Sequence, residues 1–279
     1  MNSKVGRTKV ILAGVSGWTG QAVARAILDS EDLELFGAVS RRCAGQDVGL
    51  LLGRSSAQVK IVSGVEEALN GPGSGSERLP ADVFIDYTSA ASVKAHVLTA
   101  LGQGVSTVVG SSGLTAADFA EIDQLAKSKS CGVIACGNFS ITAALAKHFA
   151  LIAARHLPHW EIIDYAHGQK PDVPSGTVRE LAEELAQVKA NRLGRPLAEI
   201  IGPTEARGAQ IEGTPVHSVR LPGFVLAFET IFGLPNERLS IRHDAGAGAE
   251  PYVDGTLLAV RRVGALTGLT RGLDSLLLS

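Results

Sequence analysis

The first forty residues constrain the fold of this chain most strongly. An apolar run at 10–13 is followed by Gly14, Gly17 and Gly20, and then by apolar residues at helical spacing over 21–28. Strand, tight turn and helix in this order begin a βαβ unit with parallel strands. Glycines let the backbone approach a pyrophosphate, and the helix N-terminus offers free N–H groups and the positive end of the dipole. The spacing G-x-x-G-x-x-G therefore predicts a dinucleotide site.

Strands and helices keep alternating up to about residue 138. The apolar pattern predicts strands at 33–40, 83–86, 106–110 and 132–136, and helices at 93–101 and 116–127. This alternation is typical of an α/β protein, so we expect a Rossmann-type, doubly wound parallel sheet as a dinucleotide-binding domain over residues 1–138. The stretch 70–80 is rich in Gly, Ser and Pro and predicts a mobile surface loop.

The second half of the chain has a different pattern. It predicts helices at 142–157 and 177–189, and strands at 161–165, 216–221, 225–232 and 239–243. The last three strands have short connections, which favour antiparallel pairing. Residues 139–245 are therefore expected to form a smaller α+β domain with a mixed or antiparallel sheet. Residues 246–279 return to helix, mainly over 252–263, and are expected to rejoin the Rossmann domain.

Composition excludes several classes of partner. With a net charge of −2, the chain lacks the excess of positive charge that binds nucleic acid or an anionic membrane. Aromatic residues make up 5% of the chain, too few for a surface on which bases stack. No apolar segment is long enough to span a bilayer, and the polar first residues do not suggest a secretory signal. The three scattered cysteines argue against a disulfide framework or a metal site. We expect a cytoplasmic protein with no nucleic-acid, membrane or metal partner.

The end of the second strand bears on the choice of cofactor. An NAD site usually has Asp or Glu there, whereas this chain has Ser40, Arg41 and Arg42. Guanidinium groups suit the 2′-phosphate of NADPH. The alternative is that these arginines are ordinary solvated surface residues. We expect NADPH as cofactor, with NADH possible.

The loop 167–177 is the best candidate for a substrate site. Thr177 and Glu180 have the spacing of a capping box, so a helix is predicted to start near 175–177, where it could bind an anion. Lys170 would add a cation, and His167 could donate a proton or a hydrogen bond. Taken singly, each could be a plain helix cap, a solvated lysine or a loop histidine. Their clustering predicts a site for a substrate that carries carboxylates.

Several stretches resemble the dihydrodipicolinate reductase family. Besides the glycine turn, they are 82–88 (Asp-Val-Phe-Ile-Asp-Tyr-Thr), 110–113 (Gly-Ser-Ser-Gly), 137–140 (Gly-Asn-Phe-Ser) and 161–164 (Glu-Ile-Ile-Asp), followed by His167, Lys170, Asp172 and 174–177 (Pro-Ser-Gly-Thr). The resemblance implies hydride transfer to a small carboxylate-bearing cyclic imine in diaminopimelate and lysine biosynthesis. It also implies that the second domain binds substrate and that its sheet forms the core of a homotetramer.

The resemblance also implies roles for individual residues. The pyrophosphate would be held by Gly14, Ser16, Gly17, Trp18, Thr19 and Gly20. The adenosine ribose would lie near Arg41, beside Ser40 and Arg42. The nicotinamide side of the cofactor site would be formed by Thr88, Gly110, Ser111, Ser112, Asn138 and Phe139. The substrate would meet Ser112, His167, Lys170, Ser175, Gly176 and Thr177, with His167 and Lys170 as the catalytic pair.

The catalytic loop departs from the family pattern. The family has two adjacent histidines where this chain has Ala166 and His167, and more basic residues where it has Gly168 and Gln169. It also has Thr-Thr at the Ser-Ser of 111–112. Alanine cannot transfer a proton, and loss of a general acid costs about 10²–10⁴-fold in rate. Three alternatives follow: the proton comes from His167, Lys170, Tyr165 or water; the substrate is another imine or enamine acid; or the protein binds dinucleotide without catalysis.

Overall fold

The computed structural model describes residues 6–71 and 81–277, so most of the loop predicted at 70–80 lies outside the described residues. Contacts between residues divide the chain into two compact units. Unit 1 consists of 1–140 and 249–279, and unit 2 consists of 141–248. Each unit contains one β-sheet.

The sheet of unit 1 has seven strands in the order β12-β6-β5-β4-β1-β2-β3, and every pairing is parallel. This confirms the predicted Rossmann-type sheet. The strands are β1 (Thr8–Ala13), β2 (Leu33–Val39), β3 (Ile61–Val62), β4 (Val83–Asp86), β5 (Ser106–Val109), β6 (Gly132–Ala135) and β12 (Gly268–Arg271).

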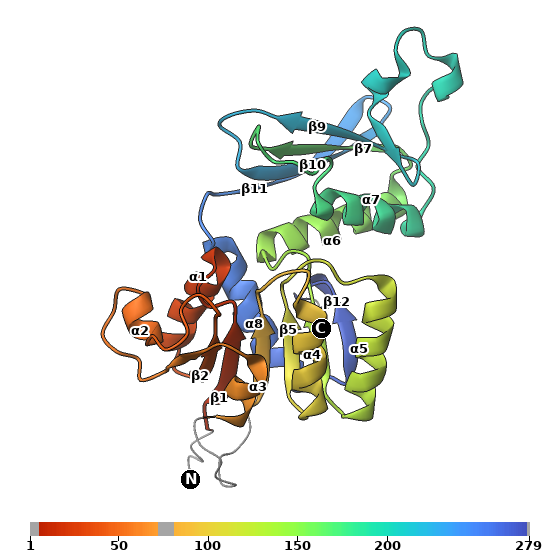
Figure 1. Cartoon of the computed structure of the whole chain (residues 1–279). Helices are drawn as coiled ribbons and strands as arrows, with labels where there is room; N and C mark the ends of the chain where they lie inside the picture. Colours follow the sequence, from red (N-terminus) through yellow and green to blue (C-terminus); the bar gives the residue numbers. More distant parts are fainter. Residues whose placement is uncertain (1–5, 72–80, 278–279) are drawn as a thin grey trace. The chain divides into compact units, whose positions relative to one another are not determined.

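Helices cover this sheet in two groups. In Figure 1, α4 and α5 lie side by side; α3 packs on α4, and α1 packs on α8. The helices are α1 (Trp18–Leu28), α2 (Val48–Leu51), α3 (Val65–Asn70), α4 (Val93–Gly102), α5 (Ala116–Ser128), α8 (Val253–Val263) and α9 (Asp274–Leu277), with a short 3₁₀ turn η3 (Glu250–Tyr252). Every residue of β4, β5 and β6 is buried, as expected for a parallel sheet with both faces covered.

The strand order fixes where a ligand can bind in unit 1. The chain starts at β1 in the middle of the sheet and later resumes beside it at β4, so the order reverses between these two strands. Ligands of such sheets bind outside the carboxyl ends of the strands at this switch point. The candidate ligand site is therefore the sheet edge formed by the carboxyl ends of β1, β2, β4, β5 and β6.

Unit 2 has a five-stranded mixed sheet in the order β11-β10-β7-β9-β8. Its elements are α6 (Ile141–His156), β7 (Trp160–Ala166), α7 (Gly176–Val188), the 3₁₀ turns η1 (Leu197–Glu199) and η2 (Thr204–Arg207), β8 (Ala209–Ile211), β9 (Thr214–Arg220), β10 (Leu226–Leu234) and β11 (Glu237–Ala245). Strands β10 and β11 form the expected antiparallel hairpin.

The expected pairing of β9 with β10 is wrong. Strand β7 lies between them, parallel to β9 and antiparallel to β10. The distance across two strand spacings is about 9.6 Å, and the five-residue link 221–225 is long enough to cross it. A short connection therefore did not require direct pairing here.

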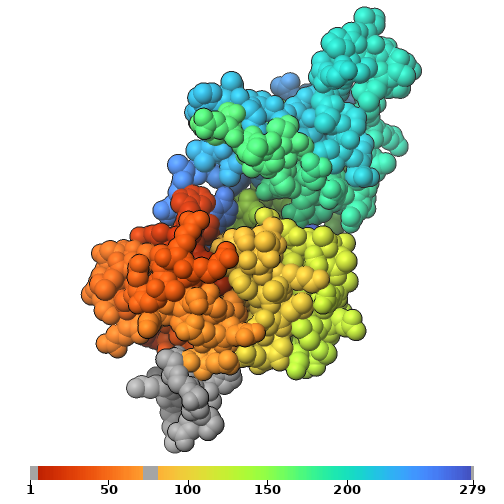
Figure 2. Space-filling model, in the orientation of Figure 1, coloured from red at the N-terminus to blue at the C-terminus, as the bar shows by residue number. Residues whose placement is uncertain are grey.

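Both α-helices of unit 2 lie on the same face of its sheet (Figure 1). Alternate residues of β7, including Trp160 and Ile162, join Phe228 and Phe232 in a core closed by apolar residues of α6 and α7. The opposite sheet face carries no α-helix of its own unit. Figure 2 shows that the segment around residue 200 projects from the body of unit 2.

Replacing Gly20 with Ala should destabilise unit 1. A Cβ at Gly20 would lie 2.1 Å from the carbonyl oxygen of Gly14, so the backbone would have to shift. We expect the free energy of unfolding in urea to fall by about 1–3 kcal/mol. Gly102→Ala is the control, because a Cβ there meets nothing within 4 Å. Equal stability of the two variants would contradict the close approach of the backbone at the turn.

Candidate active site

The glycine turn after β1 fits a pyrophosphate. Gly14 has a φ of +88°, and a Cβ there would lie 2.2 Å from the Tyr87 carbonyl oxygen. Gly17 precedes α1 in an extended conformation, provides no side-chain cap, and is followed by a first turn without acidic residues. The first N–H groups of α1 and its positive dipole end are therefore available to an anion.

The other residues predicted around the adenosine half lie beside this turn. Ser16 Oγ is 2.6 Å from Ser40 Oγ, so the turn is hydrogen-bonded to the end of β2. Trp18 begins α1 and is 57% exposed, and its ring packs edge-on against Tyr252 at 5.9 Å between centroids. Arg41 and Arg42 are exposed, and within residues 6–71 and 81–277 neither guanidinium has an ion pair or hydrogen bond.

The residues predicted for the nicotinamide side follow β4, β5 and β6. Gly110 is required by packing, because a Cβ would lie 2.2 Å from the Tyr87 ring. Asn138 Oδ1 accepts a hydrogen bond from Ser140 N at 2.8 Å, and buried Phe139 packs edge-on against Tyr87. Ser112 is exposed. The structure thus places all the predicted cofactor residues at the carboxyl edge of one sheet.

Asp86, at the end of β4, was missed as a site residue by sequence reasoning. It is fully buried, and its carboxylate is hydrogen-bonded by Thr88, Ser111 and His96. Burial opposes ionisation, but the hydrogen bonds from His96, Ser111 and Thr88 outweigh it and hold the pKa of Asp86 below its usual range. A carboxylate that ends a wholly apolar strand is a signal that could have found it.

In unit 2, the substrate loop leads into the N-terminus of α7. Ser175 is the N-cap, and its Oγ accepts a hydrogen bond from Val178 N at 3.4 Å. The predicted capping box of Thr177 and Glu180 is wrong. Thr177 already lies inside the helix, and the position three residues after the cap is Val178, which has no carboxylate. The helix still starts in the predicted segment 175–177.

A buried ion pair holds this helix start, and the sequence analysis did not single it out. Asp164 Oδ2 accepts a hydrogen bond from Ser175 N at 2.8 Å and is 2.6 Å from Arg220 Nη2. Arg220 Nη2 also donates to the Asp172 carbonyl oxygen at 2.9 Å. Asp164 lies on the inward face of β7, between apolar Ile162 and Ala166. A charged residue at a position where the alternating pattern predicts an apolar one is the sequence signal that could have identified it.

The loop presents His167 and Lys170 from one tight turn, in which Lys170 N donates to the His167 carbonyl oxygen. His167 is exposed, and its Nδ1 accepts a hydrogen bond from Gln169 N at 3.3 Å, which leaves Nε2 to carry the proton of a neutral ring. Lys170 Nζ lies 2.6 Å from Asp172 Oδ1 and holds the pKa of that carboxyl below its usual range. Ala166 is completely buried at the end of β7.

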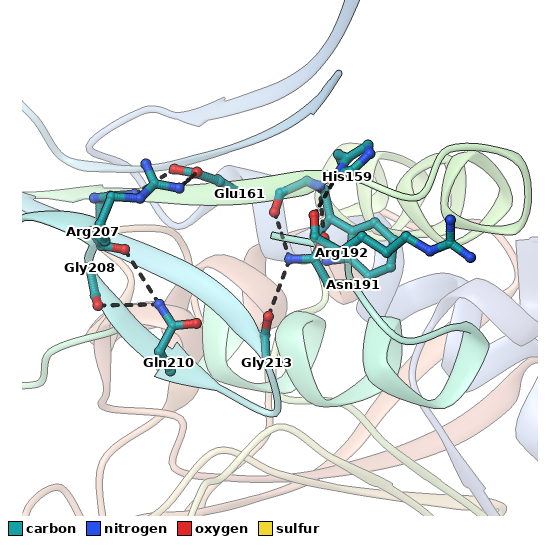
Figure 3. Close-up of polar contacts among 10 residues, drawn as sticks. His159, Glu161, Asn191, Arg192, Arg207, Gly208, Gln210 and Gly213 are labelled. Atoms are coloured by element: carbon teal, nitrogen blue, oxygen red, sulfur yellow. Dashed lines mark hydrogen bonds and ion pairs between the residues drawn. The ribbon is translucent and has the colours of Figure 1, made fainter. Parts of the chain in front are cut away.

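A separate cavity of about 540 Å³ in unit 2 borders the start of β7. Its lining includes His159, Trp160, Glu161, Arg192, Arg207, Ile231 and Arg238. Figure 3 shows that Arg207 reaches Glu161, and that Asn191 Nδ2 donates to the carbonyl oxygen of Gly213. Asn191 Nδ2 also donates to the Trp160 carbonyl oxygen at 2.9 Å. The seven residues of β7 span about 20 Å, so this cavity is distinct from the loop that follows the other end of the strand.

Comparisons with known proteins decide the family. The models for the N-terminus and the C-terminus of dihydrodipicolinate reductase match residues 8–139 and 139–277. This chain belongs to the dihydrodipicolinate reductase family. It is 40% identical over 274 residues to the 4-hydroxy-tetrahydrodipicolinate reductase of Moorella thermoacetica, and the match covers 96% of this chain and 97% of that protein.

Solved structures agree with this assignment. The dipicolinate-bound dihydrodipicolinate reductase of Paenisporosarcina sp. is 30% identical and superposes with a TM-score of 0.81 over 96% of this chain and 99% of that one. GenD2 from gentamicin A biosynthesis, solved in complex with NAD, shares the fold at 14% identity and a TM-score of 0.63, covering 99% of this chain and 92% of that one. Family and glycine turn together support a nicotinamide dinucleotide as cofactor. Among the described residues, no helix is long and apolar enough to cross a membrane.

Removing the cation of the buried pair should be costly. Arg220→Met would leave the carboxylate of Asp164 buried without its partner, so we expect the free energy of unfolding in urea to fall by about 3–5 kcal/mol. The control is Arg54→Met, whose ion pair with Asp29 is exposed on both sides and should be worth less than about 1 kcal/mol. Similar losses in the two variants would show that the buried pair does not hold the loop.

Proposed function

We propose that this protein reduces 4-hydroxy-tetrahydrodipicolinate to tetrahydrodipicolinate in diaminopimelate and lysine biosynthesis, with a nicotinamide dinucleotide as reductant. One observation supports this more than any other: the family match extends without a break through the Rossmann unit and through the loop with Lys170 and the Ser175 helix start. A dinucleotide-binding protein that does not act on this type of substrate would not need that loop.

The cofactor site is proposed at the carboxyl edge of the unit 1 sheet. The first N–H groups of α1 would hold the pyrophosphate, because the N–H of Gly17 itself already donates to the Gly14 carbonyl oxygen. Arg41 and Arg42 are free to bind a 2′-phosphate, which supports a preference for NADPH over NADH. When bound, the nicotinamide would supply the hydride. Thr88, Gly110, Ser111, Ser112, Asn138 and Phe139 would orient its ring.

The substrate site is proposed at the loop of unit 2. The N–H groups of Gly176 and Thr177, which have no hydrogen-bond partner among residues 6–71 and 81–277, would hold one carboxylate with help from Lys170. Asp172 already pairs with Lys170, so a substrate carboxylate must share or displace that contact. Lys170 or His167 Nε2 would deliver the proton, because Ala166 cannot.

One observation favours a second candidate within the same chemistry. The position of the family's first histidine is Ala166, a buried methyl group. A reductase of another small cyclic imine or enamine acid would fit the same cofactor site and the same carboxylate-binding loop. A panel of such imines separates the candidates, since the true substrate should have the highest kcat/KM.

We further propose a cytoplasmic homotetramer that assembles through the sheet of unit 2. By the alternation along β7 and β10, the face without α-helices carries partly buried Ile163, Tyr165 and Ile231. It also carries both signs of charge, with Glu161 and Glu229 near Arg242 and Arg207. A mixed apolar and self-complementary surface of this kind suits pairing with a second copy of the same face.

Lys170 is the residue whose loss tests the substrate site. We expect Lys170→Met to lower kcat/KM for the freshly generated substrate by about 10²–10⁴-fold, because a proton donor and a carboxylate ligand are lost together. The assay is NADPH oxidation at 340 nm. Lys189→Met, at the other end of α7, is the matched control and should leave turnover unchanged. Full activity of the Lys170 variant would show that the loop is not the substrate site.

The two arginines test the choice of cofactor. We expect the double variant Arg41→Ala/Arg42→Ala to weaken NADPH binding by about 10–100-fold, because charge-assisted hydrogen bonds to the 2′-phosphate are lost. NADH binding, measured by the same fluorescence titration, should change by less than about threefold. An equal loss for both cofactors would contradict the proposed contact with the 2′-phosphate.

A further inference from the structure

A hydrogen-bonded cluster surrounds Asp86 at the end of β4. Its Oδ1 accepts hydrogen bonds from Thr88 Oγ1 at 2.7 Å, Ser111 Oγ at 2.6 Å and Thr88 N at 3.0 Å. Its Oδ2 lies 2.8 Å from His96 Nδ1. The Asp86 side chain is completely buried, while that of His96 is 25% exposed. All four residues belong to unit 1.

The donors and acceptors of this cluster can be assigned. A buried carboxylate stays ionised only where enough donors surround it, and Asp86 has four. An ionised carboxylate can only accept hydrogen bonds, so His96 Nδ1 must carry a proton and both hydroxyls must point theirs at Asp86. Each hydroxyl has a single proton. Toward solvent, Thr88 and Ser111 can therefore offer only lone pairs.

This arrangement determines what the two hydroxyls can bind. Thr88 and Ser111 are partly exposed and follow the carboxyl ends of neighbouring strands β4 and β5. A ligand group that meets them must bring N–H or O–H donors. The nicotinamide ring has one such group, the N–H₂ of its carboxamide, and the orientation of that amide fixes which face of the ring is presented.

We propose that Asp86, held by His96, is a positioning residue that locks Thr88 and Ser111 as hydrogen-bond acceptors for the carboxamide N–H₂ of the nicotinamide. Asp86 itself does not touch the cofactor. This inference rests on the proposed placement of the nicotinamide beside Thr88 and Ser111.

The variant Asp86→Leu keeps the approximate shape of the side chain but removes both accepting oxygens. Asn would not serve, because Thr88 and Ser111 both donate to Oδ1 and an amide oxygen in that place could keep both hydrogen bonds. In Asp86→Leu both hydroxyls are free to turn their protons toward the ligand, where they would oppose an N–H donor. Thr88→Val and Ser111→Ala remove one acceptor each and leave the Asp86 carboxylate with its remaining donors.

The test compares three ligands by equilibrium titration with each purified variant: NADP⁺, its 3-acetylpyridine analogue and 2′-phospho-ADP-ribose. The analogue has a methyl group in place of the amide N–H₂, and the fragment lacks the ring altogether. The wild-type protein should prefer NADP⁺ to the analogue. In Asp86→Leu, NADP⁺ binding should fall about 10–100-fold, the preference over the analogue should vanish, and binding of the fragment should change by less than about threefold.

The single-hydroxyl variants keep the test decisive if Asp86→Leu does not fold, because each should lose much of the preference for NADP⁺ over the analogue. Thr107→Val is the matched control. Thr107 is fully buried on β5, and its hydroxyl has no partner among the described residues, so this variant should retain the wild-type preference.

Equal weakening of NADP⁺ and the fragment in folded Asp86→Leu would give Asp86 a purely structural role and overturn the proposal. An undiminished preference for NADP⁺ in Asp86→Leu, Thr88→Val and Ser111→Ala would overturn it too. If the wild-type protein binds the fragment and not NADP⁺, the proposed placement of the nicotinamide fails first, and the inference fails with it.

Discussion

Five parallel strands of unit 1 end at one edge of its sheet, and this geometry decides where a ligand can bind. Residues from five separate stretches between Gly14 and Phe139 reach that edge because β1, β2, β4, β5 and β6 all run the same way. A parallel sheet is buried on both faces, so the strand interiors are apolar and polar chemistry is restricted to the strand ends. The glycines of the first turn then remove the side chains that would block close approach of a phosphate.

Each unit keeps one buried carboxylate at or near a strand end and uses it to order the loop beyond. Asp86 binds the hydroxyls that follow β4 and β5, and Asp164 binds the backbone at the start of α7. A buried charge is costly unless it is paired or fully hydrogen-bonded. If either loop moved far, its carboxylate would be left buried without hydrogen bonds. The loops are therefore held in place, and the residues predicted to bind ligand are already oriented before a ligand binds.

The sequence predicted the Rossmann-type sheet well because its signals are local: an apolar run, a glycine turn and a helical period. The pairing of β9 with β10 was predicted wrongly because β7, more than fifty residues earlier in the chain, lies between them. The capping box at Thr177 failed for a smaller reason, a helix start two residues earlier at Ser175. Arg220 and His96 were not predicted, because each matters only through a buried carboxylate that the fold brings beside it.

The source of the proton in unit 2 is the main chemical question, because Ala166, a buried methyl group, stands where the resemblance implies a histidine. The most direct test follows the hydride itself. Purified protein is mixed with 4,4-dideuterated NADPH and with 4-hydroxy-tetrahydrodipicolinate made in the same vessel by its synthase, and the product is analysed by mass spectrometry. We expect tetrahydrodipicolinate that carries one deuterium per molecule of NADPH oxidised. Tightly bound NADPH with no labelled product would contradict the proposed function.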